Sequence, residues 1–234
     1  MTRQTSWAVA ISTYNRPDVL EFTLSQFDKY GGDIIIINDH SDVDYPNDER
    51  IITNDKRIGI AKVKNKSICL LREYDHIFLF DDDCFPINDK WWEPYLNLKD
   101  LTGKKVHHTV HAVNMGISKQ NDEVVYWTGC LGCALMIDQE VLRVAGGMDN
   151  RFGFWGYEHA EYTYRICKMG ITPHPFITPK VNNLWSFDAQ GSYGGFTWKS
   201  KSSIPPKEKD RCMMENSVIF TQRKTMRYEP CGSE

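Results

Sequence analysis

The first third of the chain alternates short apolar runs with a segment of helical periodicity. Trp7–Ser12, Asp33–Ile37 and His76–Phe80 consist largely of apolar residues, which is typical of strands buried on both faces of a parallel sheet. Asp18–Tyr30 has apolar residues at approximate helical spacing and is followed by two glycines, which end a helix. The order strand, helix, strand predicts a right-handed crossover.

Later segments continue this alternation. Three prolines in Ile171–Pro179 exclude a central strand and allow only an edge strand. Pro205 and Pro206 are expected to break any helix, which leaves a tail with one short helix around Lys209–Ser217. The other predicted elements are strands at Arg50–Thr53 and Val124–Trp127 and helices at Gly59–Tyr74, Asp89–Leu98, Asp138–Ala145 and Tyr157–Met169.

Composition and charge indicate an ordinary soluble globular protein. The chain has 234 residues, within range for one domain, and its net charge of -3 gives no general attraction to nucleic acid. No run approaches about 18 apolar residues, so we expect no transmembrane segment. Met1–Trp7 is polar and lacks the apolar run of a secretory signal. The seven cysteines form an odd set, which fits a reducing compartment, and we predict a cytoplasmic protein.

Three adjacent acids, Asp81, Asp82 and Asp83, directly follow a predicted buried strand. Adjacent carboxylates repel one another, and a solvated turn would not need all three. Oxygen ligands suit magnesium, manganese or calcium, so the cluster predicts a site for a hard divalent cation. In an extended chain Asp81 and Asp83 face the same way, which makes them the natural pair of ligands.

Polar residues also follow the first two strands, at Thr13–Arg16 and Asn38–Asp42. Because ligands gather beyond the carboxyl ends of parallel strands, both segments are expected in one crevice. The next helix has a basic start, with Arg57 and the lysines at 56, 62, 64 and 66. This start is either a solvated helix face or a contact to a diphosphate.

The stretch Phe152–Arg165 joins glycines and aromatic residues to a predicted helix start. Glu158 and Glu161 are three positions apart, so both carboxylates can point into one site. Acids near a helix N-terminus are also favoured by the helix dipole. This effect alone would explain both glutamates without a catalytic role. The sharper hypothesis is that one carboxylate accepts a proton from an incoming hydroxyl group.

The cysteines and histidines give weaker signals. Cys130 and Cys133 have the spacing of a redox or zinc pair, but they lie in a run of small residues and lack a second pair, so we favour packing. His107, His108 and His111 fall in an alternating segment, where the first and last would share a face. No acid or cysteine is expected to complete a cluster with them, so we interpret them as ordinary strand histidines.

Taken in order, these motifs resemble the glycosyltransferases of the GT-A fold, most closely family 2, along residues 7–187. T-Y-N-R-P at 13–17 is similar to the end of that family's opening strand. N-D-H-S-D at 38–42 resembles its acidic base-binding segment, and R-I-G at 57–59 through Asn65 resembles its next helix. F-D-D-D at 80–83 resembles the Asp-x-Asp metal motif. W-G-Y-E-H-A-E-Y-T-Y-R at 155–165 resembles an element of galactosyl- and N-acetylgalactosaminyltransferases.

The resemblance implies an α/β fold, Rossmann-like with a mostly parallel sheet flanked by helices, in a single domain with a C-terminal wrapping tail. Residues 1–198 would form the GT-A domain, with a nucleotide-sugar half at about 1–86 and an acceptor half at about 87–198, and residues 199–234 the tail. The implied activity is that of a hexosyl- or pentosyltransferase using a UDP-sugar and Mn²⁺ or Mg²⁺. Implied donor-binding residues are Thr13, Tyr14, Asn15, Arg16, Asp39, Arg57, Asn65, Asp81, Asp82, Trp155 and Gly156; metal ligands are Asp81, Asp83 and His174; catalytic candidates are Glu158, His159 and Glu161.

Two departures from the family pattern affect the mechanism. The family usually has Asp directly after the Glu, whereas this chain has His159, so the base is Glu158, His159 or Glu161. An acceptor hydroxyl activated there would attack the anomeric carbon from the far side and invert it, although a similar element occurs in retaining relatives. Many relatives also supply a late His to the metal. Val181–Trp185 occupies roughly that place, and His174, flanked by two prolines, is the nearest substitute.

Two alternative activities and two acceptors stay open. A sugar nucleotidyltransferase should have a glycine-rich loop after the first strand, and Thr13–Pro17 contains no glycine. A non-catalytic sugar-binding protein would not need the acids. The acceptor is either a glycan, which we favour, or a hydroxymethylated base in viral DNA. Five aromatic residues would equally suit stacking on bases, stacking on sugars or packing in the core. They are Trp91, Trp92, Trp185, Tyr193 and Trp198.

Overall fold

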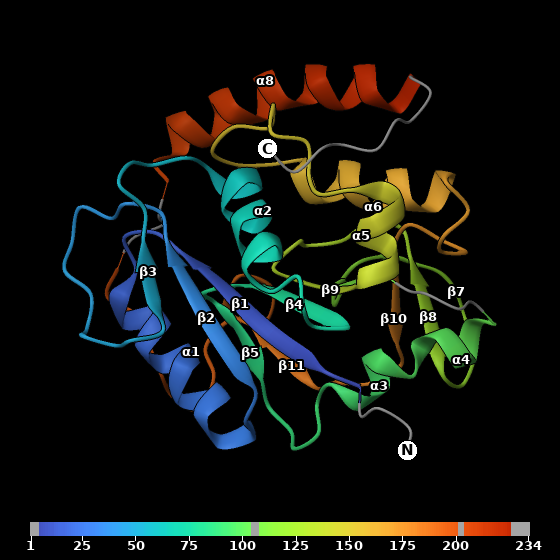
Figure 1. Cartoon of the computed structure of the whole chain (residues 1–234), viewed down its shortest axis with the longest axis horizontal. Helices are drawn as coiled ribbons and strands as arrows, with labels where there is room; N and C mark the ends of the chain where they lie inside the picture. The colour runs from blue at the N-terminus through green and yellow to red at the C-terminus, as the bar shows by residue number, and fades with distance from the viewer. Residues whose placement is uncertain (1–4, 104–107, 201–203, 226–234) are drawn as a thin grey trace.

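The computed structural model describes residues 5–103, 108–200 and 204–225. At its centre is a six-stranded sheet in the order β3-β2-β1-β4-β9-β6. Its strands β3, β2, β1 and β4 can be followed in Figure 1. Strands β3, β2, β1 and β4 are parallel, whereas β9 pairs antiparallel with both β4 and β6. The sheet is therefore mostly parallel, as predicted. Its strands are β1 (Trp7–Thr13), β2 (Asp33–Asn38), β3 (Ile51–Thr53), β4 (His76–Asp81), β6 (His108–Val110) and β9 (Ala134–Asp138).

The alternation of side chains along β1 creates a core on each face of this sheet. Val9 and Ile11 pack in one cluster with apolar residues of α1, and Ala8 and Ala10 pack in another with residues of α2. The parallel strands are thus covered on both sides, which explains their nearly continuous apolar sequences. The helices are α1 (Pro17–Tyr30), α2 (Ile60–Leu70), α3 (Glu93–Leu96), α4 (Leu98–Thr102), α5 (Gln139–Ala145), α6 (Glu158–Lys168), α7 (Phe187–Gln190) and α8 (Pro206–Thr225).

The order of the sheet reverses at β1, which lies between β2 and β4. Ligands of open α/β sheets bind at such a point, outside the carboxyl ends of the strands. The carboxyl end of β1 is Thr13, and that of β4 is Asp81. The polar segments that follow these strands therefore lie side by side.

Two small antiparallel sheets complete the second half. β10 is an edge strand of the sheet β10-β8-β7, as its prolines predict, and β11 pairs with β5. The backbone N–H of Phe187 donates to the carbonyl of Asp83 at 3.0 Å, so the start of α7 lies beside the acidic turn. The strands are β5 (Cys84–Pro86), β7 (Ile117–Gln120), β8 (Val124–Trp127), β10 (Ile177–Pro179) and β11 (Leu184–Ser186).

Helix α8 is much longer than the short helix expected in the tail. It spans 20 residues and lies across one side of the molecule, where it contacts α6 (Figure 1). The prediction that Pro206 breaks any helix is wrong, because proline is tolerated in the first turn, where its missing N–H has no partner in any case. None of the helices in the described ranges is long and apolar enough to cross a bilayer.

Candidate active-site cleft

One cleft of about 750 Å³ lies at the carboxyl ends of β1 and β4. The aspartates that follow β4 line it, and so do Glu158 and His159 from the first turn of α6. These two groups are about 75 positions apart in the sequence. The fold nevertheless brings them together in one cleft.

The three aspartates form a turn rather than an extended strand. Asp81 ends β4, and Asp82 and Asp83 connect it to β5, so the alternation argument that paired Asp81 with Asp83 does not apply. Arg16 pairs with both Asp82 and Asp83. Asp81 instead contacts the ammonium group of Lys64 at 3.2 Å. All three carboxylates line the cleft, each balanced in part by a cation.

Negative charge nevertheless accumulates around Asp83. Burial raises the pKa of Asp83 to about 8, with Asp188 and the adjacent aspartates adding to the shift and Arg16 opposing it. Asp188, on α7, also lines the cleft. The Oδ1 atom of Asp83 is buried and has no hydrogen-bond partner within the described protein. Sequence reasoning missed Asp188, because it belongs to no recognised motif.

Glu158 and His159 form a hydrogen-bonded pair. The Nδ1 atom of His159 lies 3.0 Å from Oε1 of Glu158, and the imidazole is the more exposed partner, at 17% against 5%. Burial raises the pKa of Glu158, but His159 and Lys64 outweigh it and lower that pKa to about 2. Burial lowers the pKa of His159, whereas Cys130 and Glu158 outweigh it and leave it well above the usual value.

The lack of a side chain at Gly132 leaves room for the His159 ring beside the loop before β9. A Cβ atom at Gly132 would lie 2.4 Å from Cγ of His159, and the φ of 76° also favours glycine there. The carbonyl of Gly132 accepts a hydrogen bond from the buried Lys64 ammonium at 3.0 Å. Burial alone would lower the pKa of Lys64, but Asp81 and Glu158 outweigh it and raise that pKa. Lys64 thus connects the two acidic groups electrostatically. The sequence showed it only as part of a basic helix start.

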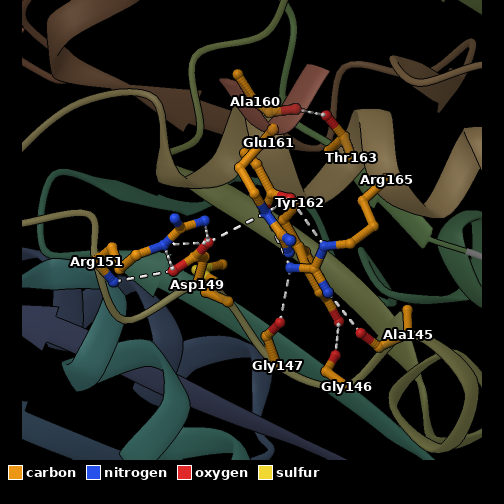
Figure 2. Close-up of polar contacts among 12 residues, drawn as sticks. Ala145, Gly146, Gly147, Asp149, Arg151, Ala160, Glu161, Tyr162, Thr163 and Arg165 are labelled. Atoms are coloured by element: carbon orange, nitrogen blue, oxygen red, sulfur yellow. Dashed lines mark hydrogen bonds and ion pairs between the residues drawn. The ribbon is translucent and has the colours of Figure 1, made fainter. Parts of the chain in front are cut away.

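Glu161 does not line the cleft. Its carboxylate accepts two hydrogen bonds from Arg165, at 2.9 and 3.0 Å, and both side chains are 0% exposed (Figure 2). Arg165 also donates to the carbonyls of Ala145 and Gly147, which tie α6 to the turn after α5. The spacing of three residues therefore does not bring both glutamates into one site. Glu161 stabilises the position of the helix that carries Glu158.

Replacing Glu161 with alanine is expected to lower the free energy of unfolding by about 3–5 kcal/mol, because it leaves the buried Arg165 guanidinium without its carboxylate. Urea denaturation would measure the change. Glu140→Ala is the matched control, since Glu140 pairs with Arg143 on the surface and such pairs contribute little. Equal midpoints for the two variants would contradict the structural role of Glu161.

Five of the remaining predicted donor-binding residues also line the cleft near β1 and β2. Asp39 is buried and accepts hydrogen bonds from the backbone N–H groups of Ile58 and Gly59, so it fixes the turn into α2. The guanidinium of Arg57 lies between the rings of Tyr14 and Phe154, at 4.2 and 4.3 Å from their centroids. The five residues are Thr13, Tyr14, Arg16, Asp39 and Arg57.

Three further predicted site residues lie outside the cleft. Asn65 is buried and holds the turn after α5 through both the N–H and the carbonyl of Met148. Asn15 pairs with Asp42. The Nδ1 atom of His174 bonds locally to Phe176, and the ring packs on Tyr126, outside the cleft that the aspartates line. The structure therefore does not place His174 where it could complete a metal site with Asp81 and Asp83.

Trp155 and Gly156 connect the cleft to α8. Both carbonyls accept hydrogen bonds from the amide of Asn216, and the ammonium of Lys209 lies 5.0 Å from the Trp155 ring. Of the five aromatic residues weighed as stacking partners, Trp198 lines the cleft. Trp91 is fully buried in the core instead.

Sequence comparisons relate the chain to known transferases. Residues 115–184 match a family described as the N-terminal domain of galactosyltransferase. The chain is also 24% identical over 210 residues to an uncharacterized glycosyltransferase of Acanthamoeba polyphaga mimivirus, in an alignment that covers 78% of this chain and 81% of that protein.

Solved structures share the fold at low sequence identity. GalNAc-T7 with UDP, GalNAc and Mn²⁺ matches with a TM-score of 0.61 and 14% identity, over 98% of this chain and 53% of that one, so this chain spans about half its length. The mannosyltransferase PcManGT from Pyrobaculum calidifontis, in complex with GDP-Man and Mn²⁺, matches with a TM-score of 0.58 and 14% identity, over 97% of this chain and 67% of that one. The catalytic domain of Drosophila beta1,4galactosyltransferase 7 matches with a TM-score of 0.52 and 16% identity, over 89% of this chain and 79% of that one. The fold is therefore of the GT-A type.

Proposed function

We propose that this chain, a glycosyltransferase with the GT-A fold, transfers a sugar from a UDP-sugar to a glycan hydroxyl with inversion, with the aid of a divalent cation. The observation that carries the proposal is the single cleft that contains both the aspartates after β4 and the Glu158–His159 pair. One group suits a diphosphate-bound cation, and the other suits a hydroxyl nucleophile. Two of the similar structures contain Mn²⁺ together with a nucleotide or nucleotide sugar, which supports this division of the site.

The acidic residues fit a hard divalent cation. Carboxylate oxygens are the ligands that Mn²⁺ and Mg²⁺ favour, and Oδ1 of Asp83 is buried without a hydrogen-bond partner in the described protein. Asp81 and Asp83 would hold the ion, and Asp188 lines the same cleft, whereas His174 does not. A cation bound there would neutralise the donor diphosphate and help the nucleoside diphosphate depart.

The protein's own residues would position the donor. Asp39, at the end of β2, would hydrogen-bond the uracil or the ribose through its carboxylate. Arg57, held between two aromatic rings, would place a positive charge near the diphosphate. Residues 1–86 supply these groups, which agrees with the division into a nucleotide-sugar half and an acceptor half that we propose for residues 1–198.

We assign the base to His159, with Glu158 as the residue that orients it. The Nδ1 atom faces the Glu158 carboxylate, so Nε2 would accept the proton of the acceptor hydroxyl. The hydroxyl oxygen then bonds to the anomeric carbon as the bond to the diphosphate breaks on the far side, which inverts the configuration. The position of His159 is also where related transferases usually have an acid.

A glycan acceptor suits the aromatic residues of the cleft better than a modified DNA base. Trp155 and Trp198 are 37% and 39% exposed and line the cleft, where their indole faces could pack on sugar rings. The net charge of -3 provides no general attraction to DNA. Hydroxymethylated DNA stays in the acceptor screen as the alternative.

A screen of nucleotide sugars with Mn²⁺ tests the proposal. The purified chain is expected to release UDP from one UDP-sugar, slowly with water and faster when the correct glycan is added. Product configuration determined by NMR would decide between inversion and retention. Pyrophosphate release from a nucleoside triphosphate and a sugar phosphate would instead indicate a nucleotidyltransferase. Sugar binding by calorimetry, with no nucleoside diphosphate released from any donor, would indicate a non-catalytic protein.

A further inference from the structure

Three candidate metal ligands that the proposed reaction does not use lie together in the protein core. Cys84 begins β5, His111 directly follows β6, and Cys133 directly precedes β9. Each is at most 7% exposed. One ligand atom from each lies within 4.8 Å of the other two, and within the described ranges no other three His, Cys, Asp or Glu residues meet this condition.

The histidine of this cluster has an unsatisfied nitrogen. The Nε2 atom of His111 is buried and has no hydrogen-bond partner in the described protein. Buried polar atoms are nearly always satisfied, so such an atom calls for a ligand or a water. The His111 ring lies beside two thiols, whose sulfur atoms, once deprotonated, are strong ligands for zinc.

We propose that Cys84, His111 and Cys133 bind one zinc ion. Sulfur and nitrogen donors favour zinc over the hard ions that suit carboxylates, so this site and the aspartates would select different metals. Two thiolates would neutralise the charge of Zn²⁺, which allows the complex to sit in an apolar core. A tetrahedral zinc site needs its ligand atoms within about 4 Å of one another, so only a small adjustment is required.

A small cavity lies beside the histidine of this cluster. It has a volume of about 10 Å³ and is lined by His111, Tyr95 and Thr109 among apolar residues, but not by Cys84 or Cys133. This volume is at the lower limit for one water molecule, so the cavity has no room for a substrate.

The ion would hold together the segments that shape the catalytic cleft. Cys84 directly follows Asp83, and the carbonyl of Cys133 accepts a hydrogen bond from the N–H of Asp81 at 2.8 Å. The carbonyl of His111 accepts one from Leu131, within the loop that lines the cleft. Zinc at this point would therefore fix the acidic turn and the Gly129–Cys133 loop relative to each other.

Metal analysis of the full chain, purified under reducing conditions without chelators, tests this inference. About one zinc per chain is expected by mass spectrometry of the metal content. After zinc removal, Co²⁺ should give a thiolate-to-cobalt charge-transfer band, and excess Mn²⁺ should not abolish it. The variants Cys84→Ala and His111→Gln are expected to bind Co²⁺ at least about tenfold more weakly, because even changes in the residues that support metal ligands cost 10–100-fold.

Cys212→Ala is the matched control, because Cys212 is also a buried free cysteine but lies on α8. It should bind zinc and cobalt as the unmodified chain does. The inference fails if the unmodified chain takes up neither metal or if zinc stays bound in the Cys84 and His111 variants. It also fails if intact mass shows that Cys84 and Cys133 form a disulfide. The cobalt titration of the unmodified chain decides the matter even if a variant does not fold.

Discussion

Asp83→Ala is expected to abolish sugar transfer while the protein stays folded, with a fall in kcat of at least about a hundredfold. A bound cation stabilises a departing diphosphate by several kcal/mol, and each 1.36 kcal/mol corresponds to a factor of ten. Asp83 is the best-placed ligand, since its Oδ1 atom is buried without a hydrogen-bond partner in the described protein, and the residue lines the cleft together with Asp81, Asp82 and Asp188. UDP release with the best donor and Mn²⁺ would measure the effect.

The fold should tolerate this change. The pKa of Asp83 is raised to about 8 in the folded protein, mainly by burial. The native state therefore binds a proton more tightly than the unfolded chain, so this group lowers stability as pH rises from about 4 through 8. Removing the carboxylate should not reduce the denaturation midpoint at neutral or alkaline pH. Loss of activity in a folded variant would then reflect chemistry.

Asp89→Ala is the control for Asp83→Ala, because Asp89 is exposed and lies six positions further along. Its activity should match that of the unmodified chain. A chelator should abolish activity, and added Mn²⁺ should restore it, in the unmodified chain and in the control. Full activity of Asp83→Ala would show that the metal assignment is wrong, whatever the role of the other aspartates.

The strands of the central sheet could be predicted from the sequence, because they depend on local runs of apolar residues. The apolar runs of β1, β2 and β4 require burial on both faces, which two helical layers provide. The acidic turn and the start of α6 then fall at the ends of predicted elements, so their residues could be identified before their positions were known. Helix α8 was underestimated because Pro206 was interpreted as a break rather than as a first helical residue.

The roles of individual acids depended on partners that the sequence does not display directly. Glu161 and Arg165 are four positions apart, the spacing of a helical ion pair, and this signal could have separated Glu161 from Glu158. Asp188 lies near the acidic turn because α7 begins beside Asp83, and Lys64 meets Asp81 and Gly132 through contacts between segments distant in the sequence. The Cys84, His111 and Cys133 cluster likewise combines three segments, so the expectation that no cysteine completes a cluster with His111 is wrong. His107 lies outside the described residues.

His159→Ala is expected to reduce kcat by about 10²–10⁴, the usual contribution of a general base. In the unmodified chain kcat/KM should fall as the pH decreases through the pKa of His159, because only the neutral imidazole accepts a proton. That pKa is raised well above 6.5, since Cys130 and Glu158 outweigh the effect of burial. Activity should therefore increase through neutral pH and level off in the alkaline range.

Glu158→Gln tests whether His159 or Glu158 is the general base. It removes the negative charge that stabilises the imidazolium, so the pKa of His159 should decrease and the acid limb of the pH–rate profile should move to lower pH. Its maximal rate should also decrease, because the imidazole loses its orienting carboxylate. If Glu158 itself took the proton, its pKa of about 2 would make the profile of the unmodified chain flat across neutral pH. A flat profile, with Glu158→Gln inactive at every pH, would transfer the role of base to Glu158.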